Sequence, residues 1–326
     1  MAIDPEYLSP DDLLKMLLST FQQSTSGMLK NFLEMHRSVR KWFVVSDFVI
    51  ADPQAFRDAY VYTLFPYETP LEQLKAHLAK LAPRDLKKSK TVSHEFTNYL
   101  QSGAVFSFCF LTPKRYRVAG NIENVREALD KTVQMMQSWH DAGTQTQVIQ
   151  AFRVLRQRAN ANGFNAGLMS TMTIATSVAA FVALILAAES RAELVGWFPD
   201  RDKITHAYDR IASYMFSVNF SAFCQQQGVD EGHAKIIIGD AAASDIGGED
   251  AWYDELIRVP DAVAGALAVW DYERNLVPSK LKFSEVLRGA IADNPYLVIL
   301  SLMVTNEGRG VGVVRTSRSP FPDATT

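Results

Sequence analysis

Asp261 stands out because it follows a proline and precedes a run of small and apolar residues, within the stretch Glu255–Ala268. Pro260 suits the first position of a helix, because its missing N–H group would have no partner there. Asp261 would then lie in the first helical turn, where the helix dipole favours a carboxylate. A carboxylate at the entrance of an apolar helix needs a cation, a hydrogen-bond donor or a metal ion. It either stabilises the helix alone or converges with other acids on one site.

Other acids lie where a site could use them. Asp47 interrupts the apolar run 41–50, which is typical of a central strand buried on both faces, and burying it unpaired would cost roughly several kcal/mol. Asp85 and Lys87 precede a predicted helix, where the simpler interpretation is a solvated charge run. Asp200 and Asp202 follow a short apolar strand, where the simpler interpretation is a strand-to-helix turn capped by Asp202.

The elements that must position these acids follow from hydrophobic periodicity. We predict strands at 41–50, 59–66, 104–111, 193–198, 235–239 and 296–300. Helices are predicted at 9–18, 28–39, 70–81, 122–188 with breaks near 143 and 162–163, 204–223 and 280–292. Two further helices are predicted, one ending near residue 100 and one beginning at residue 260. This order predicts an α/β protein with a mixed sheet flanked by helices on both faces.

The same pattern divides the chain into three parts. Residues 1–40 form a predicted N-terminal helical arm that packs on the core or on a protein partner, including a second copy of the chain. Residues 41–315 form the α/β domain, and residues 316–326 are a polar C-terminal tail. The 326 residues and the 48% hydrophobic content suffice for a sizeable core.

Charge and cysteine content restrict the class of protein. The net charge of −3 gives no global attraction to nucleic acid, so such binding would use local basic patches. The candidates are Arg84, Lys87, Lys88 and Lys90, or Lys114, Arg115 and Arg117. Cys109 and Cys224 lie in apolar contexts without metal-binding spacing, which indicates a reducing cytoplasm. The acidic N-terminus does not have the pattern of a signal peptide.

An uncharged segment at 159–188 is long enough to span a membrane. Its first half is rich in Asn, Ser and Thr, which suits a tightly packed central helix better than contact with lipid. We therefore expect a buried helix and no membrane association.

The order of acids and elements resembles the ribonuclease-H-like superfamily, in which acids from the first strand, a later strand and a late helix meet around divalent metals. Within it, the chain is most similar to a prokaryotic family known as domain of unknown function 3800. Ser46-Asp47-Phe48, Asp85-Leu86-Lys87 and the stretch 256–266 correspond to three motifs of that family. The chain departs from it at Phe48-Val49-Ile50, where the family usually has Glu-Ser-Gly.

The resemblance implies a nuclease or phosphodiesterase site with Mg²⁺ or Mn²⁺. Two divalent ions about 4 Å apart can activate a water molecule and stabilise the leaving oxygen of a phosphodiester, and both ions prefer hard oxygen ligands. The implied ligands are Asp47, Asp261 and either Asp200 or Asp202. Asp85 is the fourth acid, and Lys87 positions a phosphate or the attacking water.

Two alternatives stay open at this stage. Asp47 with Asp85-x-Lys87 also matches the acid and acid-x-Lys signature of restriction-type nucleases, which leaves Asp261 unexplained. The missing polar turn after Asp47 also suits a catalytically inactive relative that binds a protein partner or has a regulatory role. The histidines show no paired metal spacing, and the chain has no phosphate-binding glycine loop and no nucleophile elbow.

Overall fold

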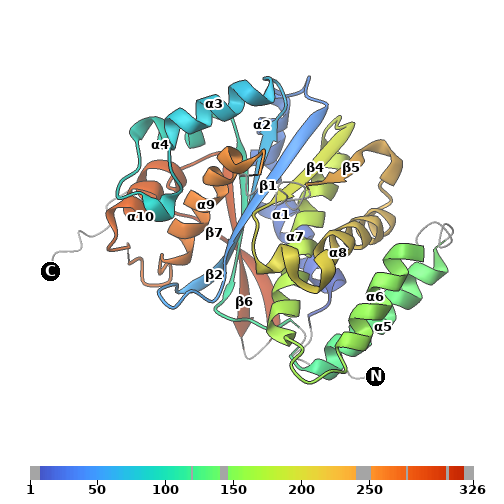
Figure 1. Ribbon diagram of the computed structural model, residues 1–326. Coiled ribbons are helices and arrows are strands. Elements are labelled where there is room, and N and C mark those ends of the chain that lie inside the picture. The colour runs from blue at the N-terminus through green and yellow to red at the C-terminus, as the bar shows by residue number, and fades with distance from the viewer. Residues whose placement is uncertain are drawn as a thin grey trace.

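A single mixed sheet organises the chain (Figure 1). The computed structural model describes residues 8–118, 120–139, 146–239, 251–276, 278–305 and 308–318, without the side chains of Lys87 and His233. The sheet has 7 strands in the order β5-β4-β1-β2-β3-β6-β7. The strands are β1 (Lys41–Val49), β2 (Arg57–Pro66), β3 (Phe106–Pro113), β4 (Leu194–Pro199), β5 (Lys235–Ile238), β6 (Leu297–Thr305) and β7 (Gly308–Val314).

Strand directions make the sheet mixed. β2 is antiparallel to both β1 and β3, and β7 is antiparallel to β6. The β1–β4, β4–β5 and β3–β6 pairs are parallel. The strands β1, β3, β4, β5 and β6 therefore all end at the same edge of the sheet. The predicted α/β class with a mixed sheet flanked by helices is confirmed.

Helices cover both faces of the sheet (Figure 1). One side, which we call the α7 face, carries α1 (Pro10–Ser24), α2 (Ser26–Met35), α5 (Ile122–Ser138), α6 (Thr146–Arg158), α7 (Ala166–Glu189) and α8 (Lys203–Gln227). The other side, the α9 face, carries α3 (Leu71–Leu81), the short helix η1 (Leu86–Lys88), α4 (His94–Gln101), α9 (Asp254–Ala268), α10 (Leu281–Val286) and η4 (Leu287–Ile291). A further short helix, η2 (Glu231–His233), precedes β5.

The uncharged segment forms α7, which is long and apolar enough to cross a membrane. However, 89% of its most apolar window is buried within the protein. Phe181 lies at its centre and packs against Phe21 of α1 and Phe108 of β3. The prediction of a buried central helix, with a break before it near residue 163, is confirmed.

The N-terminal helices contribute to the same core. Leu14 and Phe21 of α1 and Phe32 of α2 are at most 1% exposed. Thr20 of α1 also donates a hydrogen bond to the Val311 carbonyl of β7. The apolar faces of the predicted arm are thus buried within the chain, which is the core-packing alternative of the prediction.

Two local predictions were wrong. α9 begins at Asp254, so Pro260 lies inside the helix and Asp261 is not in its first turn. The segment before Pro260 folds as helix although a proline at this position removes one i→i−4 hydrogen bond. The strand β7 was also missed, because its sequence Gly-Arg-Gly-Val-Gly-Val-Val is rich in glycine, which is disfavoured in strands. Of the predicted polar tail, residues 319–326 lie outside the described residues.

Candidate functional site

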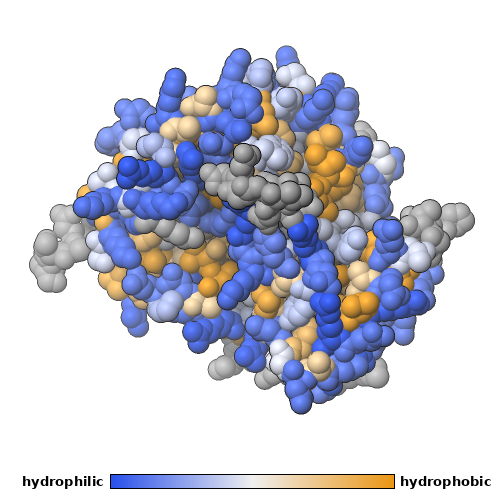
Figure 2. Space-filling model, in the orientation of Figure 1, coloured by the Kyte–Doolittle hydropathy of each residue, from blue (hydrophilic) through white to orange (hydrophobic). Residues whose placement is uncertain are grey.

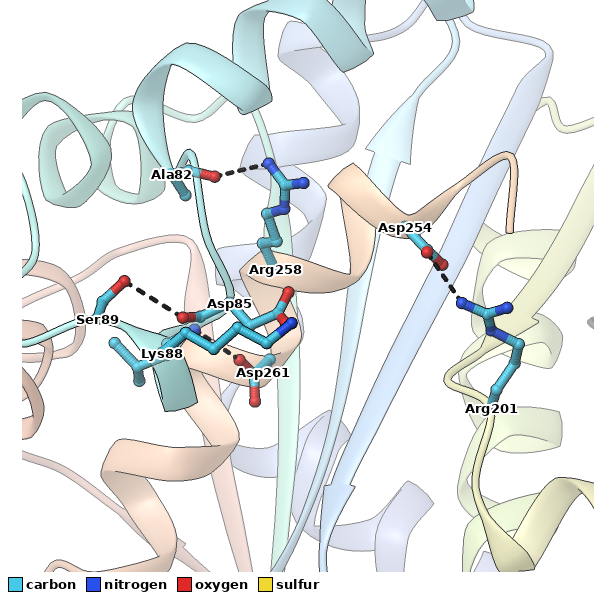
Figure 3. A network of polar contacts seen from close by, with 9 residues as sticks. Ala82, Asp85, Lys88, Ser89, Arg201, Asp254, Arg258 and Asp261 are labelled. Carbon is cyan, nitrogen blue, oxygen red and sulfur yellow. Dashed lines mark hydrogen bonds and ion pairs between the residues drawn. The ribbon is translucent and has the colours of Figure 1, made fainter. Parts of the chain in front are cut away.

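A pocket of about 390 Å³ opens on the α9 face, between the end of β4, the first turns of α9 and the segment leading into η1. Polar residues from these three segments line most of it, with Arg84, Asp85, Lys88, Asp200, Arg201, Asp254, Arg258 and Asp261 among them. Figure 3 shows Arg201 and Asp254 on one side and Asp85, Lys88 and Asp261 on the other. Three acids predicted from distant parts of the sequence therefore line one pocket.

Asp200 is held at the end of β4 by the parallel pairing of β1 and β4. Ser46 of β1 is aligned with Pro199 of β4, and the Asp200 N–H donates to the Ser46 carbonyl at 2.8 Å. The Asp200 Oδ1 atom accepts a hydrogen bond from the Arg201 N–H at 2.7 Å. The carboxylate is thus fixed at the strand end beside the pocket.

Asp261 reaches the pocket from the middle of α9, and it is 7% exposed. Its Oδ2 atom accepts a hydrogen bond from the Leu86 N–H of η1 at 3.1 Å. Lys282 of α10 donates to the Leu86 carbonyl at 2.6 Å, so the same η1 residue is held from both sides. Burial lowers the pKa of Lys282, the charge of Lys280 adds to this, and the charge of Asp261 opposes it.

Ion pairs join the remaining acids of the pocket to cations. Asp85 Oδ2 lies 2.9 Å from Lys88 Nζ, and Asp254 Oδ2 lies 2.9 Å from Arg201 Nη2 (Figure 3). The Arg201–Asp254 pair is the more buried, with side chains 25% and 23% exposed. The Arg258 Nη1 atom donates to the Ala82 carbonyl at 2.7 Å, which holds its guanidinium at the wall of the pocket.

Asp202 is the N-cap of α8, as the simpler interpretation of this turn predicted. Its Oδ1 atom accepts hydrogen bonds from the Ile204 and Thr205 N–H groups at 2.7 and 3.1 Å. The Thr205 hydroxyl completes a capping box with the Asp202 backbone. Burial raises the pKa of Asp202, although the Thr205 and Ile204 N–H groups oppose this effect. Between the two alternatives, Asp200 is the one that lines the pocket.

Asp47 is 3% exposed and lies on β1 under α9. The hydroxyl of the preceding Ser46 accepts a hydrogen bond from Trp197 on the α7 face. Because successive side chains of a strand point to opposite faces, Asp47 faces the α9 side. It is not among the residues that line the pocket.

The turn after β1 differs from the polar turn that the resemblance implies. Val49 ends the strand, and the Ala51 N–H donates to Asp58 at 2.7 Å. Asp58 of β2 thus holds this turn. No signal in the sequence pointed to this role.

A divalent ion would find oxygen donors in this pocket. Mg²⁺ usually keeps several water ligands and is held by one or two carboxylates together with substrate phosphates. Asp200 and Asp261 supply such carboxylates, so the donor chemistry of the pocket fits this ion together with a phosphate. Within the described ranges, no group of three or more His, Cys, Asp or Glu side chains could hold a metal ion by itself.

The two basic stretches predicted for nucleic acid lie differently. Arg84 and Lys88 line the pocket. Lys114 donates hydrogen bonds to the Pro53 and Ala55 carbonyls, at the loop between β1 and β2. Lys87 lies in η1, but its side chain falls outside the described part of the structure. The first stretch is thus the one beside the candidate site.

The sequence analysis identified Arg84 and Lys88 but missed Arg201 and Arg258. Arg201 directly follows Asp200 and Arg258 precedes Asp261 by three positions, so their position was a usable signal. Asp254 and Lys282 carry no such signal, because only the packing of α9 and α10 brings them to the site. Comparison with models of protein families, with curated proteins and with solved structures found no match to this chain.

Proposed function

We propose that the protein hydrolyses phosphodiester bonds of a nucleic acid with the help of Mg²⁺ or Mn²⁺. One observation carries the proposal: Asp85, Asp200 and Asp261 come from three distant segments and line one pocket together with arginine and lysine side chains. Carboxylates repel a phosphate unless cations lie between them, whereas Arg and Lys attract it. A pocket that combines both kinds of residue suits a phosphate accompanied by a divalent cation.

The arrangement of elements also supports an RNase H-like fold. β1 pairs directly with β4, and α9 packs on the same strand. A first strand, a later strand and a late helix are therefore neighbours, as the resemblance requires. In this proposal Asp200 and Asp261 are the protein ligands of the metal ion, whose other ligands are water and substrate phosphate, whereas the predicted ligand Asp47 lies outside the pocket lining.

Each side chain has a proposed task. A bound divalent ion supplies an activated water molecule and neutralises charge on the phosphate. Arg84, Lys88, Arg201 and Arg258 bind phosphate oxygens, and Asp85 keeps Lys88 in place between substrates. Lys87 remains a proposed positioning residue for the phosphate or the water.

A cleavage assay tests the proposal. Single- and double-stranded DNA and RNA are incubated with the protein and Mg²⁺, Mn²⁺ or EDTA, and the products are separated by size. We expect metal-dependent cleavage that falls on the order of 100-fold or more in D261N and D200N, because each variant removes a charged metal ligand. D130N serves as the control, since Asp130 is a half-exposed carboxylate of α5 paired with Arg156. Equal activity of D261N and wild type would reject the site.

A second function is favoured by the two ion pairs of the pocket. Because Asp85 and Asp254 are neutralised by protein cations, the fold is stable without a metal at these positions. This suits a catalytically inactive RNase H-like protein that binds a partner or regulates it. Nucleic-acid or protein binding without cleavage under any metal condition would support this function. A protein partner of the N-terminal helices would contact their solvent-facing residues.

A further inference from the structure

Aromatic side chains form a partly exposed cluster on the α9 face. This aromatic platform consists of Phe43, Tyr67, Phe198 and Trp252. Phe43 is central, with ring centroids 5.4 Å from Tyr67, 5.3 Å from Phe198 and 6.2 Å from Trp252. Trp252 is 42% exposed and Tyr67 is 41% exposed. Large aromatic surfaces are normally buried, so two exposed rings in one cluster indicate a binding surface.

Glycines make room for the platform. A Cβ atom at Gly196 would lie 2.4 Å from the ring of Phe198, and one at Gly239 would also lie 2.4 Å from that ring. The ring of Phe198 therefore packs directly on Gly196 of β4 and on Gly239 after β5, where a side chain would collide with it. Figure 2 shows apolar residues gathered on the surface over β4 and β5.

The platform adjoins the pocket. Trp252 precedes Asp254 at the start of α9, and Phe198 precedes Arg201 at the end of β4. Asp254 and Arg201 form the ion pair at the wall of the pocket. The exposed ring of Trp252 packs on the buried ring of Phe198, with centroids 5.0 Å apart, and lies two positions from the acid of this ion pair.

We propose that the platform stacks an unpaired nucleobase of the nucleic acid whose phosphate enters the pocket, so that single-stranded nucleic acid is the substrate class. This inference rests on the proposed function. Bases stack on aromatic side chains without regard to sequence, whereas in a duplex the base faces are already covered by neighbouring bases. Arginine and lysine beside the rings match the charge of the strand that carries the base.

Binding measurements separate base stacking from phosphate binding. Fluorescence anisotropy is measured in EDTA with a labelled single strand, the matching duplex, and a strand of the same length with abasic sites throughout. The variants are W252A, W252F and F56A. Phe56 is a matched control, because it is 50% exposed and lies at the opposite end of α9, where its N–H donates to the Ala268 carbonyl.

We expect W252A to weaken binding of the single strand roughly 5- to 100-fold, which is the effect of losing one base–aromatic stack. W252F should regain most of the affinity, and F56A should bind like wild type. The abasic strand should bind wild type about as weakly as the normal strand binds W252A. W252A should bind the abasic strand only slightly more weakly than it binds the normal strand, because the base and the indole contribute to the same stacking contact. Circular dichroism confirms that the exposed substitutions leave the fold intact.

Equal affinity of W252A and wild type, or equal affinity for abasic and normal strands, would overturn the inference. Tighter binding of the duplex than of the single strand would overturn it as well. Each failure is distinguishable from failure of the proposed hydrolase. Metal-dependent cleavage together with base-independent binding would reject only the stacking of a base on the platform. Base-dependent binding without cleavage would reject only the proposed hydrolysis.

Discussion

The two faces of the sheet differ in where they place charged side chains. On the α7 face, the central helix buries nearly every residue from Met169 to Ala187 and carries no charged side chain between Ala166 and Ala188. On the α9 face, α9 brings Asp254, Arg258 and Asp261 to a pocket open to solvent. The first face stabilises the fold mainly by apolar burial, whereas the second face carries a pocket of polar groups that contribute less to stability.

One acid on each face makes the difference clear. Asp58 precedes Tyr60 by two positions on β2, so it faces the α7 side. Its carboxylate accepts hydrogen bonds from the backbone N–H groups of Ala51 and Arg115, each at 2.7 Å. Asp254 on the α9 face is instead paired with the side chain of Arg201. Backbone donors are fixed by the fold, whereas an arginine side chain can move to another anion. The α9 face can therefore exchange its internal partners for a ligand.

The largest expected effect is on the α7 face. Phe181→Ala removes a fully buried ring in contact with Phe21 and Phe108, so it should lower the free energy of unfolding by about 3–5 kcal/mol. Urea denaturation followed by circular dichroism measures it. Leu281→Ala, at a residue 58% exposed on the other face, should change the value by no more than about 0.5 kcal/mol. Similar losses in both variants would contradict the division between the faces.

The next effect concerns the acid held by the backbone. Asp58→Ala leaves two partly buried N–H groups without their acceptor, which should lower the free energy of unfolding by roughly 1–3 kcal/mol. Asp52→Ala in the same turn is the matched control, because Asp52 accepts one exposed N–H from Gln54. The same urea titrations compare the two variants. A loss in D58A no larger than in D52A would show that the backbone donors find other partners.

A smaller effect is expected from the ion pair of the α9 face. A double-mutant cycle with Arg201→Ala and Asp254→Ala should give a coupling free energy of roughly 0.5–1 kcal/mol, because both side chains are partly exposed. Salt should reduce this coupling, since partly exposed charges are screened. Denaturation at low and high salt measures it. A coupling of zero at low salt would mean that this pair does not hold the wall of the pocket.

The smallest effect is a pH dependence at the N-cap of α8. Burial raises the pKa of Asp202 above its ordinary value of 3.8, so folding favours the protonated form. The resulting contribution to stability is fully present below pH 3.8 and is lost as pH rises through the folded pKa. The asparagine of D202N does not titrate. The free energy of unfolding of wild type relative to D202N should therefore decrease from acidic to neutral pH in urea titrations. A constant difference would contradict this.

Strands buried on both faces were the most predictable elements. The runs that became β1, β2, β3 and β4 are apolar enough to be recognised without knowledge of their partners. The start of α9 was not, because Tyr253 caps it without a side-chain hydrogen bond, while Pro260 imitates a helix start seven positions later. Local signals of this kind fail where tertiary packing decides the helix boundary.

Asp85, Asp200 and Asp261 were predictable from the sequence, whereas Asp254 and its cationic partner Arg201 were not. Asp200 and Asp261 were identified from a strand end and from an apolar context, and both line the pocket. The partner of Asp254 is Arg201, which lies 53 residues away in the chain. Which cation meets which acid depends on how α9 packs on β1, the neighbour of β4, and no local pattern encodes this. The composition of the pocket walls is therefore a property of the folded chain.

The contact between α1 and β7 has a consequence for biosynthesis. Thr20 and Val311 are 291 positions apart, and they meet only when both ends of the sheet region exist. Since a ribosome adds about 5–20 residues per second, α1 waits roughly 15–60 seconds after its own synthesis for β7 to be made. During that interval the residues of α1 that later contact β7 are exposed on the nascent chain, and chaperones can bind them.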